Sequence, residues 1–213
     1  MISALRSLAM ACILSAPLAA TAGSEAAHDP FTGGDAKAGE QTAAACVACH
    51  GVGGNSTNPD WPKLAGQGSA YLYAQIKQFK AGERQNALMS APMQPLGDAD
   101  MKNLAAYFAA QPASPGVASE DALALAEPLY RAGNAERGIP ACMACHGPTG
   151  AGNAASSYPR IGGQHAAYTA AQLRAYRDGS RANGSSGAMM SAVAKALSDE
   201  EIDALASYLN GLQ

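Results

Sequence analysis

Large aromatic side chains are scarce in this sequence, which has one Trp, three Phe and eight Tyr among 213 residues. Glycine, with 23 residues, and proline, with 12, are plentiful, so much of the chain is expected in loops. A small domain with few large side chains buries little apolar surface and is only marginally stable. The composition therefore predicts a loop-rich protein whose core is completed by something other than its side chains.

The sequence also lacks any cluster of basic residues. Lys and Arg number 14 against 17 Asp and Glu, which gives a formal net charge of −3. Proteins that bind nucleic acid need a basic patch to neutralise phosphates. We therefore expect no nucleic-acid partner.

The N-terminal apolar run is too short for a transmembrane helix, which needs roughly 20 residues. It extends from Leu8 to Ala20, follows Arg6, and ends at the small-residue pattern Ala20-Thr21-Ala22. This arrangement is typical of a secretory signal peptide. We predict a signal peptide over residues 1–22 that is cleaved near Ala22, with a retained anchor as the alternative.

The rest of the chain repeats itself. Two segments recur in the same order: Cys46-Val47-Ala48-Cys49-His50-Gly51 as Cys142-Met143-Ala144-Cys145-His146-Gly147, and Pro62-Lys63-Leu64-Ala65-Gly66-Gln67 as Pro159-Arg160-Ile161-Gly162-Gly163-Gln164. Further residues match at nearly the same offset: Tyr71 with Tyr168, Gln75 with Gln172, Arg84 with Arg181, and Asp98 with Asp199. Such self-similarity indicates a duplicated domain. A Pro-, Gly- and Ser-rich stretch separates the copies, so we predict domains over 23–111 and 120–213 joined by a linker over 112–119.

Apolar residues in each copy follow helical periodicity. Residues 69–81 place Leu72, Ile76 and Phe79 on one face and end at Gly82, and residues 98–110 show a similar apolar face. Ser198 and Glu201 form a capping-box signature at the start of a last helix. Short helices are expected before each repeated cysteine motif, around 35–45 and 121–132. No segment alternates with the period of a strand, so the predicted fold is all-α with two tandem domains.

The repeated motif Cys-x-x-Cys-His is the signature of covalent haem attachment, in which two thiols bond to the haem and the imidazole binds its iron. We predict two haem c groups, with His50 and His146 as iron ligands and with Cys46, Cys49, Cys142 and Cys145 as the attachment residues. Cys12 falls in the predicted signal peptide. A thiol–disulfide pair or a four-cysteine zinc site is the alternative. Neither explains a histidine at the same place in both copies.

The sixth iron position determines whether such a site transfers electrons or binds a small molecule. A methionine in this position fills the iron and raises its potential. The candidates are Met89, Met93 and Met101 in the first copy and Met189 and Met190 in the second. When Asp98 is aligned with Asp199, only Met89 and Met190 coincide. We predict these two as ligands, with Met93 and Met189 as their rivals.

Other polar residues leave two roles open. Pro62 and Pro159 are candidates for setting the backbone against the proximal histidine. Gln67, Gln164, Arg84 and Arg181 are candidates for binding haem propionates, and the alternatives are helix entry for the glutamines and exposure to solvent for the arginines. His28 and His165 lack a counterpart in the other copy and are expected on the surface or in hydrogen bonds. His165 is an alternative ligand for the second haem.

These motifs resemble the cytochrome c4 family of di-haem bacterial cytochromes, particularly in the segments 62–68, 139–146 and 163–168. The resemblance implies two cytochrome c-like domains packed about a pseudo-twofold axis, each with His/Met ligation, and it places the methionine ligands at Met89 and Met190. It also implies a periplasmic electron carrier rather than an enzyme. Its expected partners are a respiratory donor complex and a terminal oxidase, at the periplasmic face of the membrane. The alternatives are a haem subunit of a flavin-containing sulfide dehydrogenase and, less favoured, a di-haem peroxidase.

Overall fold

The computed structural model describes residues 28–213, so the predicted signal peptide with Cys12 and Ala22 lies outside the described residues. Within this range the regular structure is helical, apart from three isolated bridges between single residues. The predicted all-α class is confirmed. No helix between residues 28 and 213 combines the length and apolarity that a membrane span requires.

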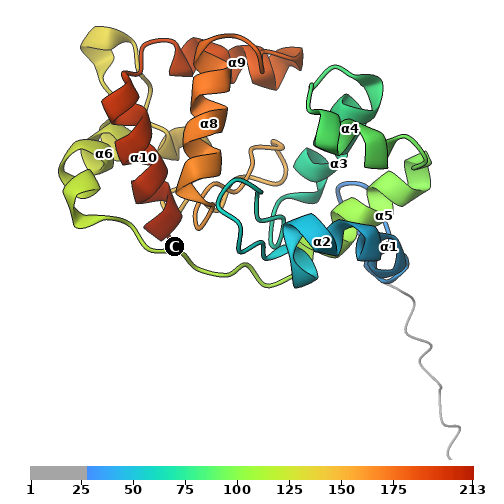
Figure 1. The fold of residues 1–213 in the computed structure, drawn as a ribbon. Helices are drawn as coiled ribbons and strands as arrows, with labels where there is room; N and C mark the ends of the chain where they lie inside the picture. Colours follow the sequence, from blue (N-terminus) through green and yellow to red (C-terminus); the bar gives the residue numbers. More distant parts are fainter. Residues whose placement is uncertain (1–27) are drawn as a thin grey trace, which may run out of the picture.

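The helices form two halves that lie side by side (Figure 1). The first half contains α1 (Ala36–Ala43), η1 (Ala44–Cys46), α2 (Val47–His50), η2 (Val52–Gly54), α3 (Ser69–Ala81), α4 (Ala87–Met93) and α5 (Asp98–Ala109). The second half contains α6 (Glu120–Ala132), η3 (Ala135–Arg137), α7 (Met143–His146), α8 (Ala166–Arg177), α9 (Gly184–Ala194) and α10 (Asp199–Gly211).

Local signals explain where the predicted helices begin and end. Helix α3 ends at Gly82, whose φ of 74° is left-handed and suits glycine. Helix α10 begins with the predicted capping box, because the Ser198 hydroxyl accepts the Glu201 N–H and the Glu201 carboxylate accepts the Ser198 N–H. The helices predicted near 35–45, 98–110 and 121–132 are also present, within a few residues. Helices α4 and α9 were not predicted.

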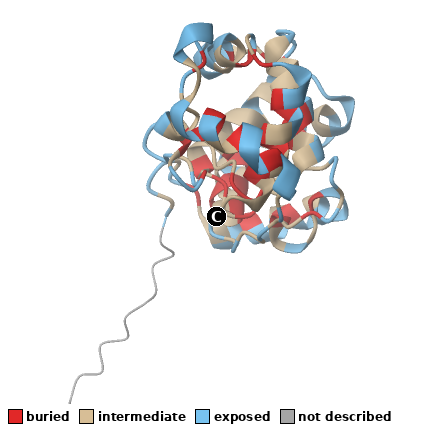
Figure 2. Cartoon of the chain, turned by 90° about the vertical axis from the view of Figure 1, so that its left-hand side faces the viewer, coloured by how far each residue is buried: buried red, intermediate tan, exposed pale blue. Residues whose placement is uncertain are grey.

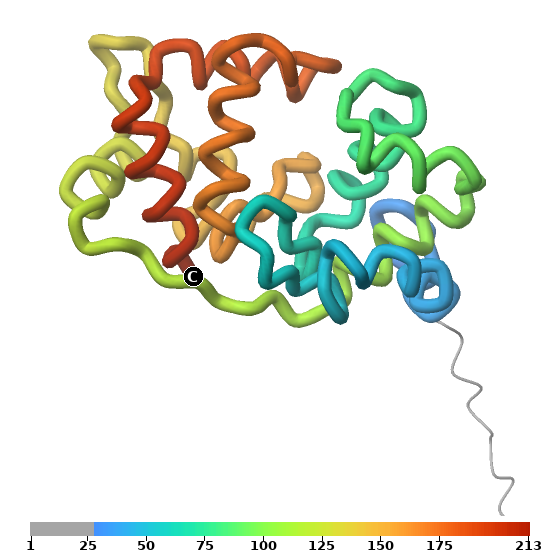
Figure 3. Tube along the Cα trace, in the orientation of Figure 1, coloured from blue at the N-terminus to red at the C-terminus, as the bar shows by residue number. Residues whose placement is uncertain are grey.

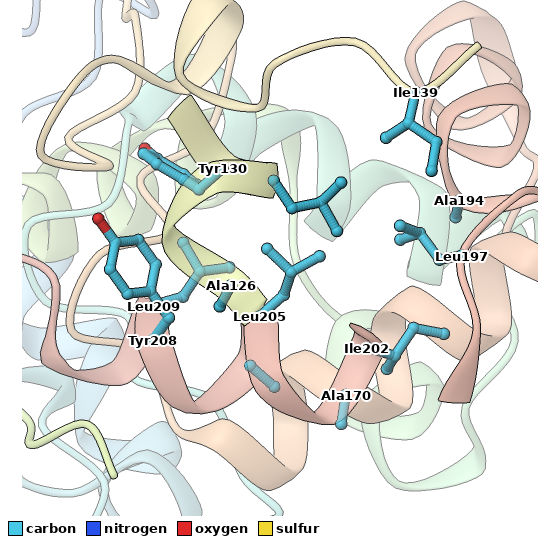
Figure 4. Packing of buried hydrophobic residues seen from close by; sticks show 12 residues of the cluster. Ala126, Tyr130, Ile139, Ala170, Ala194, Leu197, Ile202, Leu205, Tyr208 and Leu209 are labelled. Carbon is cyan, nitrogen blue, oxygen red and sulfur yellow. The ribbon is translucent and has the colours of Figure 1, made fainter. Parts of the chain in front are cut away.

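Each half has its own cluster of buried apolar side chains. In the second half, Ala126 and Tyr130 of α6 pack beside Leu205 and Leu209 of α10 (Figure 4). Seen from this side of the molecule, the buried residues lie where the helices meet and the exposed ones lie around them (Figure 2). The cluster of the first half is smaller, with Ala43, Leu72, Leu104, Ala105 and Phe108 as its buried members.

The segment predicted as a linker is bonded to both halves. It runs as an extended chain along one edge of the molecule (Figure 3). The Ser114 N–H donates to Asn55 of the first half at 2.8 Å, and the Val117 N–H donates to Asn210 of the second half at 3.0 Å. The Lys63 ammonium donates to the carbonyls of Ser114 and Pro115. The connection is therefore a fixed strap between the halves.

Candidate functional site

Each Cys-x-x-Cys-His motif occupies one short helical turn that a glycine closes. Helix α2 ends at Gly51 and α7 ends at Gly147, with φ values of 76° and 78°. A Cβ at Gly51 would lie 2.4 Å from the Asn55 carbonyl oxygen, so the turn accepts only glycine. Residues three apart lie on the same face of a helical turn, and the two thiols of each motif are spaced in this way.

Both motif histidines are oriented by a proline carbonyl from the following loop. The Nδ1–H of His50 donates to the Pro62 oxygen at 2.9 Å, and that of His146 donates to the Pro159 oxygen at the same distance. The expectation that these prolines set the backbone against the histidines is confirmed. This hydrogen bond fixes the ring orientation and leaves Nε2 to carry the lone pair that a metal requires.

The His50 ring nitrogen Nε2 is buried and has no hydrogen-bond partner. Leaving such a polar atom unpaired costs about 1–3 kcal/mol, so it needs an explanation. An iron bound at Nε2 supplies one. Burial also lowers the pKa of His50 and His146, although the proline carbonyls act in the opposite direction. The imidazoles are therefore neutral at physiological pH, which is the form that binds iron.

The second half contains a cavity that brings its predicted site residues together. Cys142, Cys145 and His146 line it, together with Met189 and Met190. It encloses about 1050 Å³ of space between atoms, some of which opens to solvent. Tyr71 and Gln75 of the first half also line this cavity, which therefore lies where the two halves meet.

The methionines lie on the two helices that were not predicted. Met89 is half-buried in α4, whereas Met93 at the end of that helix is only 4% exposed. In α9, Met190 is half-buried and Met189 is 47% exposed. Both helices lie at the same end of the molecule (Figure 1). The choice of Met89 and Met190 over their neighbours stays a prediction.

The zinc alternative requires cysteines from both motifs to meet. The two cysteine pairs lie in different halves, one on η1 and α2 and the other at the start of α7 and within it. Among residues 28–213, no three or more His, Cys, Asp or Glu side chains are gathered so that they could hold a metal ion. The geometry therefore does not support a shared four-cysteine site.

Two arginines form a polar cluster between the halves. The Arg181 guanidinium donates to the hydroxyl of Tyr71 at 2.7 Å, and the Arg84 guanidinium donates to that of Tyr168 at 3.0 Å. We call this group the arginine cluster; its members are Tyr71, Gln75, Arg84, Tyr168, Gln172 and Arg181.

No carboxylate forms an ion pair with Arg84 or Arg181 within the described part of the chain. Arg181 is only 7% exposed, so its predicted alternative role as a solvated residue is wrong. Burial tends to raise the pKa of Tyr168, but the two guanidiniums bring it below its ordinary value. Buried cations are costly unless an anion compensates them. The anionic propionates of a haem would meet that need, and Arg181 itself lines the cavity of the second half.

Sequence reasoning missed that the paired glutamines contact the opposite half. Gln67 bonds to the backbone of Arg160, and Gln164 bonds to that of Lys63. The only sequence signal was that both glutamines recur in the repeat. His165, the alternative second ligand, instead bonds through its Nε2 to the Ser56 carbonyl at 2.8 Å. His28 is exposed.

Several known proteins are similar to this chain in sequence and in structure. The family model described as cytochrome c matches residues 36–111 and 134–213. Cytochrome c4 of Stutzerimonas stutzeri is 45% identical over 188 residues, covering 84% of this chain and 90% of that protein. The thiosulfate dehydrogenase electron acceptor of Thiomonas intermedia is 41% identical, covering 78% of each chain. The crystal structure of reduced cytochrome c4 from Pseudomonas stutzeri is 45% identical, with a TM-score of 0.82 and coverage of 84% of this chain and 100% of that one.

Proposed function

Since this chain belongs to the cytochrome c family, and within it to the cytochrome c4 proteins, we propose that it carries single electrons between redox proteins of the periplasm. The protein is a di-haem electron-transfer cytochrome with two covalently bound haem c groups, and it is not an enzyme. When bound, the two haems would supply the one-electron redox chemistry of their irons. The observation that carries the proposal is the buried, unpartnered Nε2 of His50 beside a duplicated attachment motif.

The residues of the chain hold the two haems in matching ways under this proposal. Cys46 and Cys49 attach the first haem, and Cys142 and Cys145 attach the second. His50 and His146 would each bind a haem iron, and Met89 and Met190 would each supply the second protein ligand. A methionine ligand at each iron would leave no position open to a substrate, so the residues of the chain would favour electron transfer alone. The peroxidase alternative, which needs an open position, is not retained.

The partners and location follow from the N-terminal sequence and the family resemblance. The apolar run before Ala22 supports export and cleavage near Ala22, and the mature chain would then act in the periplasm. We propose a respiratory donor complex as the electron source and a terminal oxidase as the acceptor, with docking at the periplasmic face of the membrane. Which redox proteins bind this carrier depends on how well their surfaces fit its own, and the fold does not determine it.

A second candidate role is electron acceptor for a dehydrogenase. The 41% identity to a thiosulfate dehydrogenase electron acceptor favours this role. The haem subunit of a flavin-containing sulfide dehydrogenase, which the sequence left open, is a more specific form of the same role. The carrier and acceptor roles share the same haem sites and differ only in the protein that docks.

Absorption spectroscopy on protein expressed with a cytochrome c maturation system tests the proposal. We expect two covalent haems per chain by mass and haem assay, and the weak long-wavelength band of methionine-ligated ferric iron. Neither carbon monoxide nor cyanide should bind rapidly at neutral pH. Rapid binding to both irons, or a single haem per chain, would contradict the carrier function.

Stopped-flow reduction distinguishes the two roles. The oxidised protein is mixed in turn with a purified, reduced respiratory donor complex and with a thiosulfate dehydrogenase supplied with thiosulfate. Rapid, salt-dependent reduction by only the dehydrogenase would favour the second role, because encounters between redox proteins are steered by charge.

A further inference from the structure

Two glutamines at equivalent positions of the repeat each hold the backbone of the opposite half through a pair of hydrogen bonds. The side chain of Gln164 accepts the Lys63 N–H at 2.9 Å and donates to the Lys63 carbonyl at 2.9 Å. Gln67 accepts the Arg160 N–H at 2.8 Å and donates to the Arg160 carbonyl at 2.8 Å. We call these two contacts the glutamine clamps.

Each clamp acts on the peptide group that orients a haem histidine. The Lys63 N–H and the Pro62 carbonyl belong to the same peptide bond, which is planar and rigid. One edge of that plane is held by Gln164 and the other accepts the Nδ1–H of His50 at 2.9 Å. A rotation of this plane that broke one bond would therefore disturb the other.

The second half repeats this relation with the roles exchanged. The Arg160 N–H and the Pro159 carbonyl share a peptide bond, with Gln67 at one edge and His146 at the other. Gln67 is 8% exposed, so water has little access to replace its bonds. The donated N–H also polarises the peptide carbonyl, which strengthens that oxygen as an acceptor for the imidazole.

We infer that Gln164 and Gln67 are positioning residues that act across the interface, Gln164 on His50 and Gln67 on His146. This inference rests on the proposed function, since it assumes that these histidines bind the haem irons. A strong hydrogen bond at Nδ1 makes an imidazole a more electron-rich ligand. Each domain thus helps to set the reduction potential of the haem in the other domain.

The variants Gln164→Met and Gln67→Met test the inference in the full-length protein with both haems bound. Methionine keeps the length of the side chain and removes both hydrogen-bonding groups. The matched control is His165→Ala, which also removes a bond between the halves, to Ser56, but leaves the peptide groups at 62–63 and 159–160 untouched. The two haem potentials are measured by spectroelectrochemical titration, and exchange of each histidine Nδ1–H is followed by NMR in the ferrous state.

We expect each substitution to affect the haem of the opposite domain. Gln164→Met should raise the potential of the haem bound by His50 and speed exchange of the His50 Nδ1–H about tenfold, with little change at His146. Gln67→Met should do the reverse, and His165→Ala should change neither. An effect confined to the haem of the mutated domain, equal shifts at both haems, or no shift in either variant would overturn the inference.

A third variant keeps the test possible if Gln164→Met and Gln67→Met fail to mature with both haems. Gln164→Glu keeps an oxygen that accepts the Lys63 N–H, so exchange at His50 should stay within about threefold of the parent. Exchange as fast as at an unprotected imidazole would count against the clamp. The parent protein separates the two proposals: if it lacks two histidine-ligated haems, the carrier function fails, and if it has them but shows no crosswise effect, only the clamp fails.

Discussion

At the scale of single residues, both burial and a hydrogen bond hold the histidines of the two motifs in place. Each ring is buried, is held at Nδ1 by a proline carbonyl, and presents Nε2 as its remaining nitrogen. The lowered pKa that burial gives each imidazole keeps it neutral and able to bind a metal. The motif alone predicted the ligand, whereas the prolines were only candidates for setting the backbone, singled out because they recur in both copies.

The methionine ligand of the first haem is tested by comparing Met89→Ala with Met93→Ala. If Met89 binds the iron, its removal should abolish about half of the long-wavelength ferric band and lower the potential of one haem, because methionine ligation raises it. Met93→Ala should keep the band and cost about 2–4 kcal/mol of unfolding free energy, since Met93 is buried. Loss of the band in Met93→Ala alone would assign the ligand to Met93.

At the scale of elements, the two helices that carry the predicted methionines were the hardest to foresee. Helix α4 contains Pro92 and is only seven residues long, and α9 begins with Gly184-Ser-Ser-Gly187. Neither segment has the regular apolar face or the helix-forming composition that predicts a helix from local sequence. By contrast, α3 and α10 carried a clear apolar stripe and a recognisable stop or cap, so their bounds were predictable.

Helix α10 is joined to η3 by an ion pair that should make stability depend on pH. The Arg137 guanidinium donates to the Glu201 carboxylate, at 2.9 Å for Oε2, and lowers the pKa of Glu201 to about 2. Because the folded-state pKa lies below the unfolded value, the pair stabilises the fold above about pH 4.5. That contribution is lost as the pH falls towards about 2.

Glu201→Gln keeps a capping-box residue at this position and removes only the charge. We expect it to lower the free energy of unfolding by about 2 kcal/mol at pH 7, allowing for the partial solvent exposure of Arg137. The difference from the parent should shrink steadily between about pH 4.5 and pH 2 in denaturant titrations. A constant difference over that range would show that the charge of Glu201 is not the cause.

At the scale of the whole molecule, the repeat in the sequence predicted two similar domains but not how they meet. The bonds of the arginine cluster, the glutamine clamps and the strap that join the halves or the linker link residues roughly 50–110 positions apart, and local periodicity says nothing about such pairs. Gln67 and Arg84 were singled out because they recur, yet both of their suggested roles lay within one domain. Their contacts with the other half follow from docking, which only the three-dimensional structure provides.

The strap makes a specific prediction at Gly116. A Cβ there would lie 2.4 Å from the Asn210 carbonyl oxygen, so Gly116→Ala should displace the strap from the second half. We expect faster proteolytic cleavage within residues 112–119 and a loss of about 1–3 kcal/mol in unfolding free energy. Val117→Ala, at an 85% exposed position of the same segment, is the control and should leave both measurements near the parent values. Unchanged cleavage in Gly116→Ala would show that the strap tolerates the added methyl group.

The exchange of contacts in the glutamine clamps has a consequence for the origin of the molecule. Because Gln67 holds Arg160 while its repeat equivalent Gln164 holds Lys63, the interface is isologous, as in a homodimer with twofold symmetry. A single domain with one such glutamine would already carry both sides of this contact. Duplication within one gene would then need to add only a tether, and a partner that was another molecule would become a permanent part of the same chain.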